Sequence, residues 1–301
     1  MPKFDEQKNV WIKDPEDSDY PLQMQLTKEK EQIFFGELEA AMGSLYQLFL
    51  KDENAPNTSF DRQLKKVISE NIPGLMVWKD LFDTDEVEID ENGNVLKVNK
   101  QGDVTEKKIS GLEAIGISAW FLGENDLTAE NFGIVELEDH YRAVKYDHGQ
   151  SGVWLYNPIN YKDIYKIFSA DESEGCIGFA NVEFPEGIVN KKNSTEKMFK
   201  CVYRIINTNF DDIEKTLVKN ISDEFAEERS RILAALRERQ KSLKNQAEKH
   251  QEYINFLKLI PSQKSKISEK HRLFNRRNIV TTTSTSTESP EPKTKKHKTN
   301  Q

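Results

Sequence analysis

Three polar residues in the middle of the chain have the types and the spacing that phosphoryl transfer uses. Asp126 precedes Asn131 by five positions, and Asp147 follows further along the chain. In this chemistry one carboxylate positions the nucleophile, while an Asn and a second Asp hold Mg²⁺ against the phosphates of a nucleotide. Asp126, Asn131 and Asp147 are therefore candidates for a catalytic carboxylate and two metal ligands at a cofactor site for ATP and Mg²⁺.

The elements around these residues are expected to bring them together. Residues 112–122 are apolar enough to predict a buried helix, and a polar loop follows it. Two short β runs between residues 134 and 146 then lead to Asp147-His148-Gly149. A helix, a loop and a hairpin in this order place both carboxylates and the Asn near one another.

These stretches resemble the protein kinases. Residues 126–131 read D-L-T-A-E-N, like the D-L-x-x-E-N part of the kinase catalytic loop, and residues 147–149 resemble D-F-G. This resemblance implies Asp126 as the catalytic group and Asn131 and Asp147 as the metal ligands. The resemblance is closer to the atypical kinase folds, the phosphoinositide-kinase and HipA-like groups. It is closest to the kinase-like effectors secreted by Legionella-type intracellular bacteria, through Gly123-Glu124-Asn125-Asp126, Asn131-Phe132-Gly133 and Lys145-Tyr146-Asp147-His148.

The resemblance also implies a cofactor-binding Lys and Glu in the N-terminal third. Residues 36–49 resemble the helix that supplies the Lys-pairing Glu, which would be Glu37. Lys13 lies in a strand-like stretch and is the favoured Lys, because a strand, a turn and a helix can bring it to Glu37. Lys28, nearer to Glu37 in the sequence, is the alternative.

The chain departs from the kinase pattern in two places. No Gly-rich phosphate loop precedes the helix, and Glu124-Asn125 stand where the family has His-Arg. Residues 55–58 and 69–75 still resemble the strand and hinge region of that fold. A reduced N-lobe of this kind leaves room for a pseudokinase.

The rest of the chain predicts an α+β, bilobal kinase-like fold. Helical spacing at residues 29–50 and alternation at 87–109 predict a helix and a three-stranded meander. Amphipathic helices are expected between residues 210 and 260, and residues 281–301 contain no aliphatic or aromatic side chain. The predicted division is a mixed N-lobe-like region at 1–110, a catalytic-loop and helical C-lobe-like region at 111–265, and a disordered tail at 266–301.

The composition of the chain indicates which classes of binding partner and which cellular location to expect. The chain has 51 Asp and Glu against 43 Lys and Arg, a net charge of −8, which argues against a nucleic-acid partner. No stretch approaches the ~18 apolar residues of a membrane span, so no integral membrane segment is expected. The two cysteines lack metal-ligand spacing, which indicates a reducing compartment and a soluble cytoplasmic protein. Residues 281–291 resemble the C-terminal signals of type IV secreted effectors, and the basic run 293–298 is interpreted as part of a solvated tail.

Each candidate residue also has a structural interpretation. Asp126 and Asn131 fit a capped turn, and Asp147 fits a turn at the end of a strand. His140 and His148 lack a metal-binding motif, so they are interpreted as turn and strand-end residues. The leading functional hypothesis is transfer of phosphate, or of a nucleotide-derived group, to an unknown host protein or lipid. The rival is a catalytically inactive pseudokinase that acts as a protein-interaction module through the charged helices at 210–260.

Overall fold

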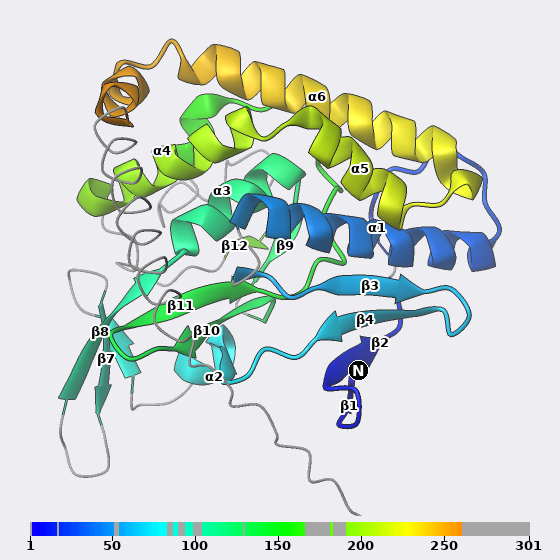
Figure 1. Ribbon diagram of the computed structural model, residues 1–301, viewed down its shortest axis with the longest axis horizontal. Helices are drawn as coiled ribbons and strands as arrows, with labels where there is room; N and C mark the ends of the chain where they lie inside the picture. Colours follow the sequence, from blue (N-terminus) through cyan, green and yellow to red (C-terminus); the bar gives the residue numbers. More distant parts are fainter. Residues whose placement is uncertain are drawn as a thin grey trace, which may run out of the picture. The chain divides into compact units, whose positions relative to one another are not determined.

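The computed structural model describes residues 2–16, 18–50, 54–82, 87–89, 94–98, 104–128, 130–165, 181–182 and 191–260. The chain divides into two compact units, residues 1–253 and 254–301. The first unit is mixed α+β, as predicted (Figure 1). It contains all the candidate site residues. In the second unit the described residues, 254–260, are helical. The predicted tail at 266–301 lies outside the described residues.

A four-stranded antiparallel sheet forms the N-terminal part of the first unit. Its strand order is β1-β2-β4-β3. The strand-like setting predicted for Lys13 is confirmed, because Lys13 is the last residue of β2. The strands are β1 (Lys3–Asp5), β2 (Val10–Lys13), β3 (Thr58–Asp61) and β4 (Lys66–Glu70).

Helix α1 (Lys28–Leu50) confirms the helix predicted at residues 29–50 and packs directly on β3. A Cβ atom on Gly36 would lie 2.3 Å from the ring of Phe60, and one on Gly43 would lie 2.9 Å from Thr58 Cβ. Because both helix positions are glycine, the backbone of α1 can approach the sheet closely. The helix therefore covers the β3 end of one sheet face.

A second, six-stranded sheet has the order β5-β10-β11-β8-β7-β6. The predicted hairpin and meander are both confirmed, although the turns of the meander lie outside the described residues. The β11–β8 pair is parallel and the other pairs are antiparallel. The strands are β5 (Leu75–Val77), β6 (Val87–Ile89), β7 (Asn94–Val98), β8 (Val104–Ser110), β10 (Phe132–Glu136) and β11 (His140–Lys145), with the short helix α2 (Trp78–Phe82) after β5.

The predicted buried helix is α3 (Leu112–Leu122), and it ends at Gly123 with φ 67°. A left-handed residue at this position is a common helix C-terminus, and it turns the chain toward the candidate site. The polar loop that follows contains a short strand that was not predicted, β9 (Asp126–Leu127), which pairs in parallel with β12 (Asn181–Val182).

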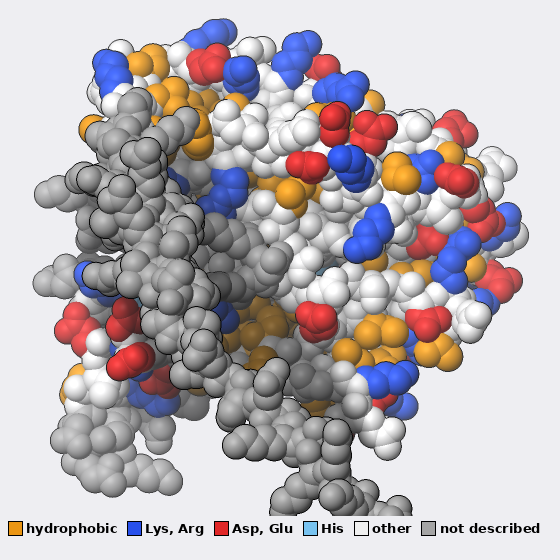
Figure 2. All heavy atoms as spheres, viewed as in Figure 1, with side chains coloured by type: hydrophobic (Ala, Val, Ile, Leu, Met, Phe, Trp, Pro, Cys, Tyr) orange, Lys and Arg blue, Asp and Glu red, His pale blue; other side chains and the backbone are white. Residues whose placement is uncertain are grey.

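Helices cover α1 and α3 on the side away from the sheets (Figure 1). The amphipathic helices expected after residue 210 are confirmed as α5 (Phe210–Asn220) and α6 (Ala226–Ala247), whereas α4 (Lys191–Asn207) was not predicted. The space-filling view shows acidic and basic side chains interspersed over α5 and α6 (Figure 2). Among the described helices, none combines the length and the apolar character needed to cross a membrane. Two 3-10 helices lie at Tyr161–Tyr165 and Asp223–Phe225.

Candidate functional site

A pocket of about 500 Å³ lies between the two sheets. This volume is within the usual range for small-molecule sites, about 300–1,000 Å³. Most of its lining is apolar, and its charged side chains include Lys13 and Asp147. The N-terminal sheet contributes Trp11, Lys13, Val67, Ser69 and Glu70. The connection between the sheets contributes residues 71, 72 and 74, and the second sheet contributes Leu75 and Val77.

The strand register explains why these side chains share one wall. Lys13 pairs with Val67, and Val67 pairs with Phe60 on the outer strand. Directly paired residues of antiparallel strands point to the same face of a sheet. Helix α1 covers this face at Phe60, so the uncovered remainder, at β2 and β4, is left to line the pocket.

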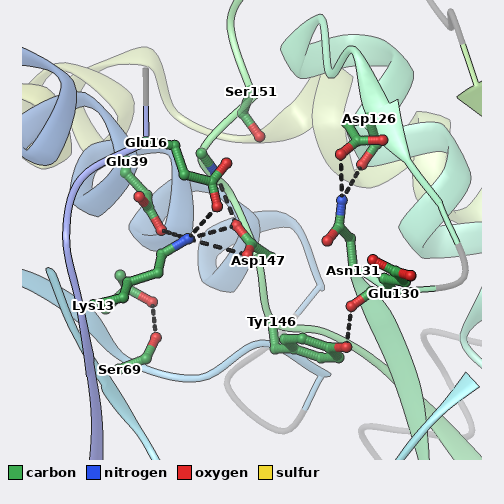
Figure 3. Close-up of polar contacts among 12 residues, drawn as sticks. Lys13, Glu16, Glu39, Ser69, Asp126, Glu130, Asn131, Tyr146, Asp147 and Ser151 are labelled. Atoms are coloured by element: carbon green, nitrogen blue, oxygen red, sulfur yellow. Dashed lines mark hydrogen bonds and ion pairs between the residues drawn. The ribbon is translucent and has the colours of Figure 1, made fainter. Parts of the chain in front are cut away.

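The Lys13 ammonium group contacts three carboxylates at one end of the pocket (Figure 3). Its Nζ lies 2.9 Å from Glu16 Oε1, 2.9 Å from Glu39 Oε1 and 2.9 Å from Asp147 Oδ1. The second Asp147 oxygen also accepts a hydrogen bond from Lys13, at 3.0 Å. One cation thus joins strand β2, helix α1 and the segment that follows β11.

Burial and the neighbouring charges have opposite effects on the pKa values of Lys13, Glu39 and Asp147. Burial favours the neutral form of Lys13, but the carboxylates of Glu39 and Asp147 outweigh it and raise the Lys13 pKa. Burial likewise opposes ionisation of Asp147, yet Lys13 and Lys145 hold its pKa well below the usual value. For Glu39 the balance is the reverse, because burial raises its pKa to about 8 against the attraction of Lys13. Lys13 and Asp147 are therefore charged at neutral pH.

The prediction that Glu37 pairs with the Lys is wrong. Glu37 accepts hydrogen bonds from the backbone N–H and the hydroxyl of Ser222, at 2.9 and 3.0 Å, and Arg62 Nε lies 2.7 Å from its other oxygen. Residues two positions apart lie about 200° apart around a helix, so Glu37 and Glu39 face opposite ways. The alternative clamp, Lys28, is the exposed first residue of α1.

Asp126 and Asn131 are brought together as predicted. Asn131 Nδ2 donates to the Asp126 carboxylate at 2.9 Å and to its backbone carbonyl at 2.8 Å. The backbone carbonyl of Asn131 in turn accepts from the backbone N–H of Asp147, at 3.5 Å. Asn131 therefore connects the two aspartates. Within the described part of the chain, no group of three His, Cys, Asp or Glu side chains is arranged to hold a metal ion by itself.

Glu124 is a buried hub that the sequence interpretation missed. Its carboxylate accepts hydrogen bonds from the Asp126 backbone N–H at 3.2 Å, from Tyr46 at 3.3 Å and from the hydroxyl of Ser151. The ammonium group of Lys145, also fully buried, lies 3.6 Å from Glu124. Glu124 thus ties helix α1, strand β9 and the loop after Asp147 to one another.

His148 is buried, with its ring stacked on Tyr46 at a centroid distance of 4.8 Å. Neither ring nitrogen has a hydrogen-bond partner among the described residues. Burial and the nearby Lys145 lower the pKa of His148 far below its ordinary value, so the ring is neutral. His140, in contrast, is hydrogen-bonded to Asp139 at the surface.

Comparison of the chain with protein-family models, with curated proteins and with solved structures finds no match in any of the three. The chemistry proposed for the site therefore rests on its own geometry. That geometry combines a small-molecule pocket, one clamped ammonium group and two aspartates linked by an Asn.

Proposed function

We propose that this chain binds ATP together with Mg²⁺ in the pocket and transfers a phosphoryl group to an acceptor, as an atypical kinase does. The observation that carries the proposal is the contact of Lys13 with both Glu39 and Asp147 at one end of the apolar pocket. In this proposal the fold is bilobal. The β1–β4 sheet and α1 form a reduced N-lobe, and α3, the β10–β11 hairpin and helices α4–α6 form the C-lobe.

Lys13 would bind the nucleotide phosphates. Its charge is secured by the surrounding carboxylates, and Glu39 holds it from a helix on the side away from Asp147 (Figure 3). A fixed cation aimed at phosphate oxygens stabilises the charge they carry during transfer. Glu39 acts here by positioning Lys13.

Asp147 and Asn131 would hold Mg²⁺, because carboxylate and amide oxygens are ligands that this hard cation accepts. Asn131 uses its side-chain N–H on Asp126, which leaves the amide oxygen pointing away from Asp126 (Figure 3). When bound, Mg²⁺ neutralises charge on the phosphate oxygens. Because two protein ligands do not fill its coordination shell, this site suits a cation that arrives with nucleotide phosphates and water.

Asp126 would position the acceptor hydroxyl group and take up its proton. The Asn131 hydrogen bond fixes the orientation of this carboxylate while leaving its other oxygen for the acceptor. A carboxylate in this role acts mainly in the transition state. The acceptor class, a host protein or a lipid, and delivery by a type IV system remain predictions from the sequence, since the tail lies outside the described residues.

One observation favours the rival, an inactive pseudokinase that serves as an interaction module. The Glu16 carboxylate occupies the space between Lys13 and Gly149, where a Cβ atom on Gly149 would lie 2.4 Å from Glu16 Oε2. A phosphate group at Lys13 would compete with this carboxylate for the ammonium group. In a pseudokinase that does not bind nucleotide, the Glu16 carboxylate can stay beside Lys13, because no phosphate group has to bind there.

A thermal-shift series on the full chain tests the proposal. ATP with Mg²⁺ should raise the melting temperature more than ATP alone or Mg²⁺ alone, because a ligand at 100 times its Kd adds about 2.7 kcal/mol of stability. Lys13→Met should lose the shift. Lys66→Met is the matched control, because Lys66 lies on the same sheet but pairs with Asp14 at the surface.

The outcomes separate the hypotheses. No stabilisation of the wild-type protein by ATP with Mg²⁺ or Mn²⁺ contradicts the nucleotide site and favours the interaction module. Stabilisation that is lost in Lys13→Met, accompanied by release of phosphate or its transfer to an acceptor, supports the kinase. Nucleotide binding without turnover supports the pseudokinase.

A further inference from the structure

The indole ring of Trp11 lines the pocket two residues before Lys13 on the same strand. Alternate residues of a strand point to the same face, so Trp11 and Lys13 project side by side from β2. Trp11 is 43% exposed, an unusually open position for a large aromatic side chain. A broad aromatic surface is thus presented next to the candidate phosphate-binding cation.

Two contacts from other strands and loops fix this ring. The indole N–H donates to Asn71 Oδ1, at 3.1 Å, across the connection that leads into β5. The ring of Phe4, on the neighbouring strand β1, lies 5.0 Å away at an angle of 43°. Asn71 is itself anchored, since its backbone N–H and side-chain N–H donate to Asn9 at 3.1 and 3.2 Å. The ring is therefore held in place before any ligand arrives, which lowers the entropic cost of binding.

The second sheet supplies aliphatic side chains, Leu75 and Val77, to the same pocket. A flat aromatic group in the pocket would have the indole ring of Trp11 and these aliphatic groups as its apolar surroundings. Groups attached to that ring and carrying negative charge would reach Lys13. The order along β2, first an aromatic surface and then a cation, matches the order of a base and its phosphates in a nucleotide.

We propose that Trp11 stacks on the base of the nucleotide and makes the pocket selective for purine nucleotides. This inference rests on the nucleotide-binding function proposed above. The bicyclic indole overlaps more of a bicyclic purine than of a pyrimidine, and stacking gains with the area in contact. Asn71 acts as a positioning residue, because it holds the indole ring through the N–H group.

The experiment measures the affinities of the full-length protein for Mg²⁺ complexes of ATP, CTP and inorganic tripolyphosphate, the last of which has no base. Wild-type protein should bind ATP at least tenfold more tightly than tripolyphosphate, with CTP between them. Trp11→Ala should bind ATP about tenfold more weakly, within the range measured for loss of a base–aromatic stack, and tripolyphosphate equally well. Trp11→Phe, which keeps a ring, should retain most of the ATP affinity.

A fluorescence measurement guards against a folding defect in the Ala variant. ATP should quench the tryptophan emission of wild-type protein. The quenching should be largely lost in Trp11→Phe at saturating ATP, although this variant still binds.

Equal affinities of Trp11→Ala and wild type for ATP would overturn the stacking role. Equal affinities of wild type for ATP and tripolyphosphate would overturn base recognition and leave phosphate binding at Lys13 intact. Failure of wild type to bind either compound would remove the nucleotide function and this inference with it.

Discussion

Lys13 Nζ lies 2.9 Å from Glu39 Oε1, and this ion pair joins the end of strand β2 to the middle of helix α1. The Glu39 side chain is only 3% exposed, while Lys13 is 16% exposed. Leaving an ionised Glu39 without Lys13 would therefore carry a desolvation cost, whereas Lys13 would keep its contacts with Glu16 and Asp147. The second oxygen of Glu39 has no hydrogen-bond partner among the described residues, so Lys13 provides the contact that stabilises this carboxylate.

At about pH 9, above the raised pKa of Glu39, Glu39→Gln should weaken binding of ATP with Mg²⁺ by tenfold or more, because a hydrogen bond to a charged group is worth roughly 1.5–3 kcal/mol and here it orients Lys13. Titration calorimetry measures the change. Glu37→Gln is the matched control, two residues away on the same helix. It should lower the free energy of unfolding by about 1 kcal/mol through its Ser222 and Arg62 contacts and leave nucleotide affinity unchanged. Equal losses of affinity in both variants would contradict the distinct roles of these two residues.

The sequence did not reveal which glutamate of helix α1, Glu37 or Glu39, contacts Lys13. Helix α1 could be predicted from its spacing, but residues 36–43 are buried without interruption. A helix that is enclosed on all sides has no polar face from which to infer its rotation. One signal was present, because Glu39 is followed directly by the apolar residues Ala40, Ala41 and Met42, where an isolated carboxylate needs a cationic partner.

The other parts of the site also include some that could be predicted from the sequence and some that could not. Asp126, Asn131 and Asp147 lie within 22 positions of one another, so local elements were enough to bring them together. The pocket could not be predicted, since it needs contacts such as Trp11 with Asn71, 60 residues apart. Helix α4 was missed although Met198, Val202 and Ile205 have helical spacing. Glu124 and Lys145 were part of the quoted resemblance, but only burial reveals that they form a pair.

Asp147→Asn should abolish the Mg²⁺-dependent part of ATP binding, because the variant keeps the side-chain shape and removes one charge from the cation site. The melting temperature should also fall, because Lys13 loses a charged partner. Asp126→Asn should behave differently. It should leave ATP affinity nearly unchanged and lower turnover by orders of magnitude, since its contact with the acceptor matters in the transition state. Calorimetry and a phosphate-release assay on both variants measure the contrast. If both variants lose nucleotide affinity equally, the separate roles assigned to these aspartates are wrong.

Glu16→Gln should increase affinity for ATP with Mg²⁺ several-fold. Its carboxylate contacts Lys13 at 2.9 Å and competes with phosphate for that cation. The free energy of unfolding should change by less than about 1 kcal/mol, because the Glu16 side chain is 38% exposed and such pairs contribute little. Asp14→Asn is the control, since Asp14 pairs with Lys66 instead and should not alter affinity. Weaker binding by Glu16→Gln would indicate that this carboxylate belongs to the nucleotide site and does not compete with the ligand.

Acid should destabilise the protein through His148. Burial holds the pKa of the folded-state ring well below the ordinary value of about 6.5, so below pH 6.5 the unfolded chain binds a proton that the folded chain does not. The stability that His148 contributes is present above pH 6.5 and is lost as pH falls toward the folded-state pKa.

Replacement by an apolar residue removes this titration. Urea unfolding of wild type and His148→Leu, in buffer without divalent cations, should show that the wild type loses about 2 kcal/mol relative to the variant between pH 7.5 and 5.0. Groups that titrate equally in both proteins, including Glu39, cancel in this difference. The test is the change in the free energy of unfolding between the two pH values, because a packing defect caused by the leucine lowers that free energy equally at both. Parallel pH curves would show that the His148 ring gains a proton in the folded state, and therefore that the segment after Asp147 opens to water.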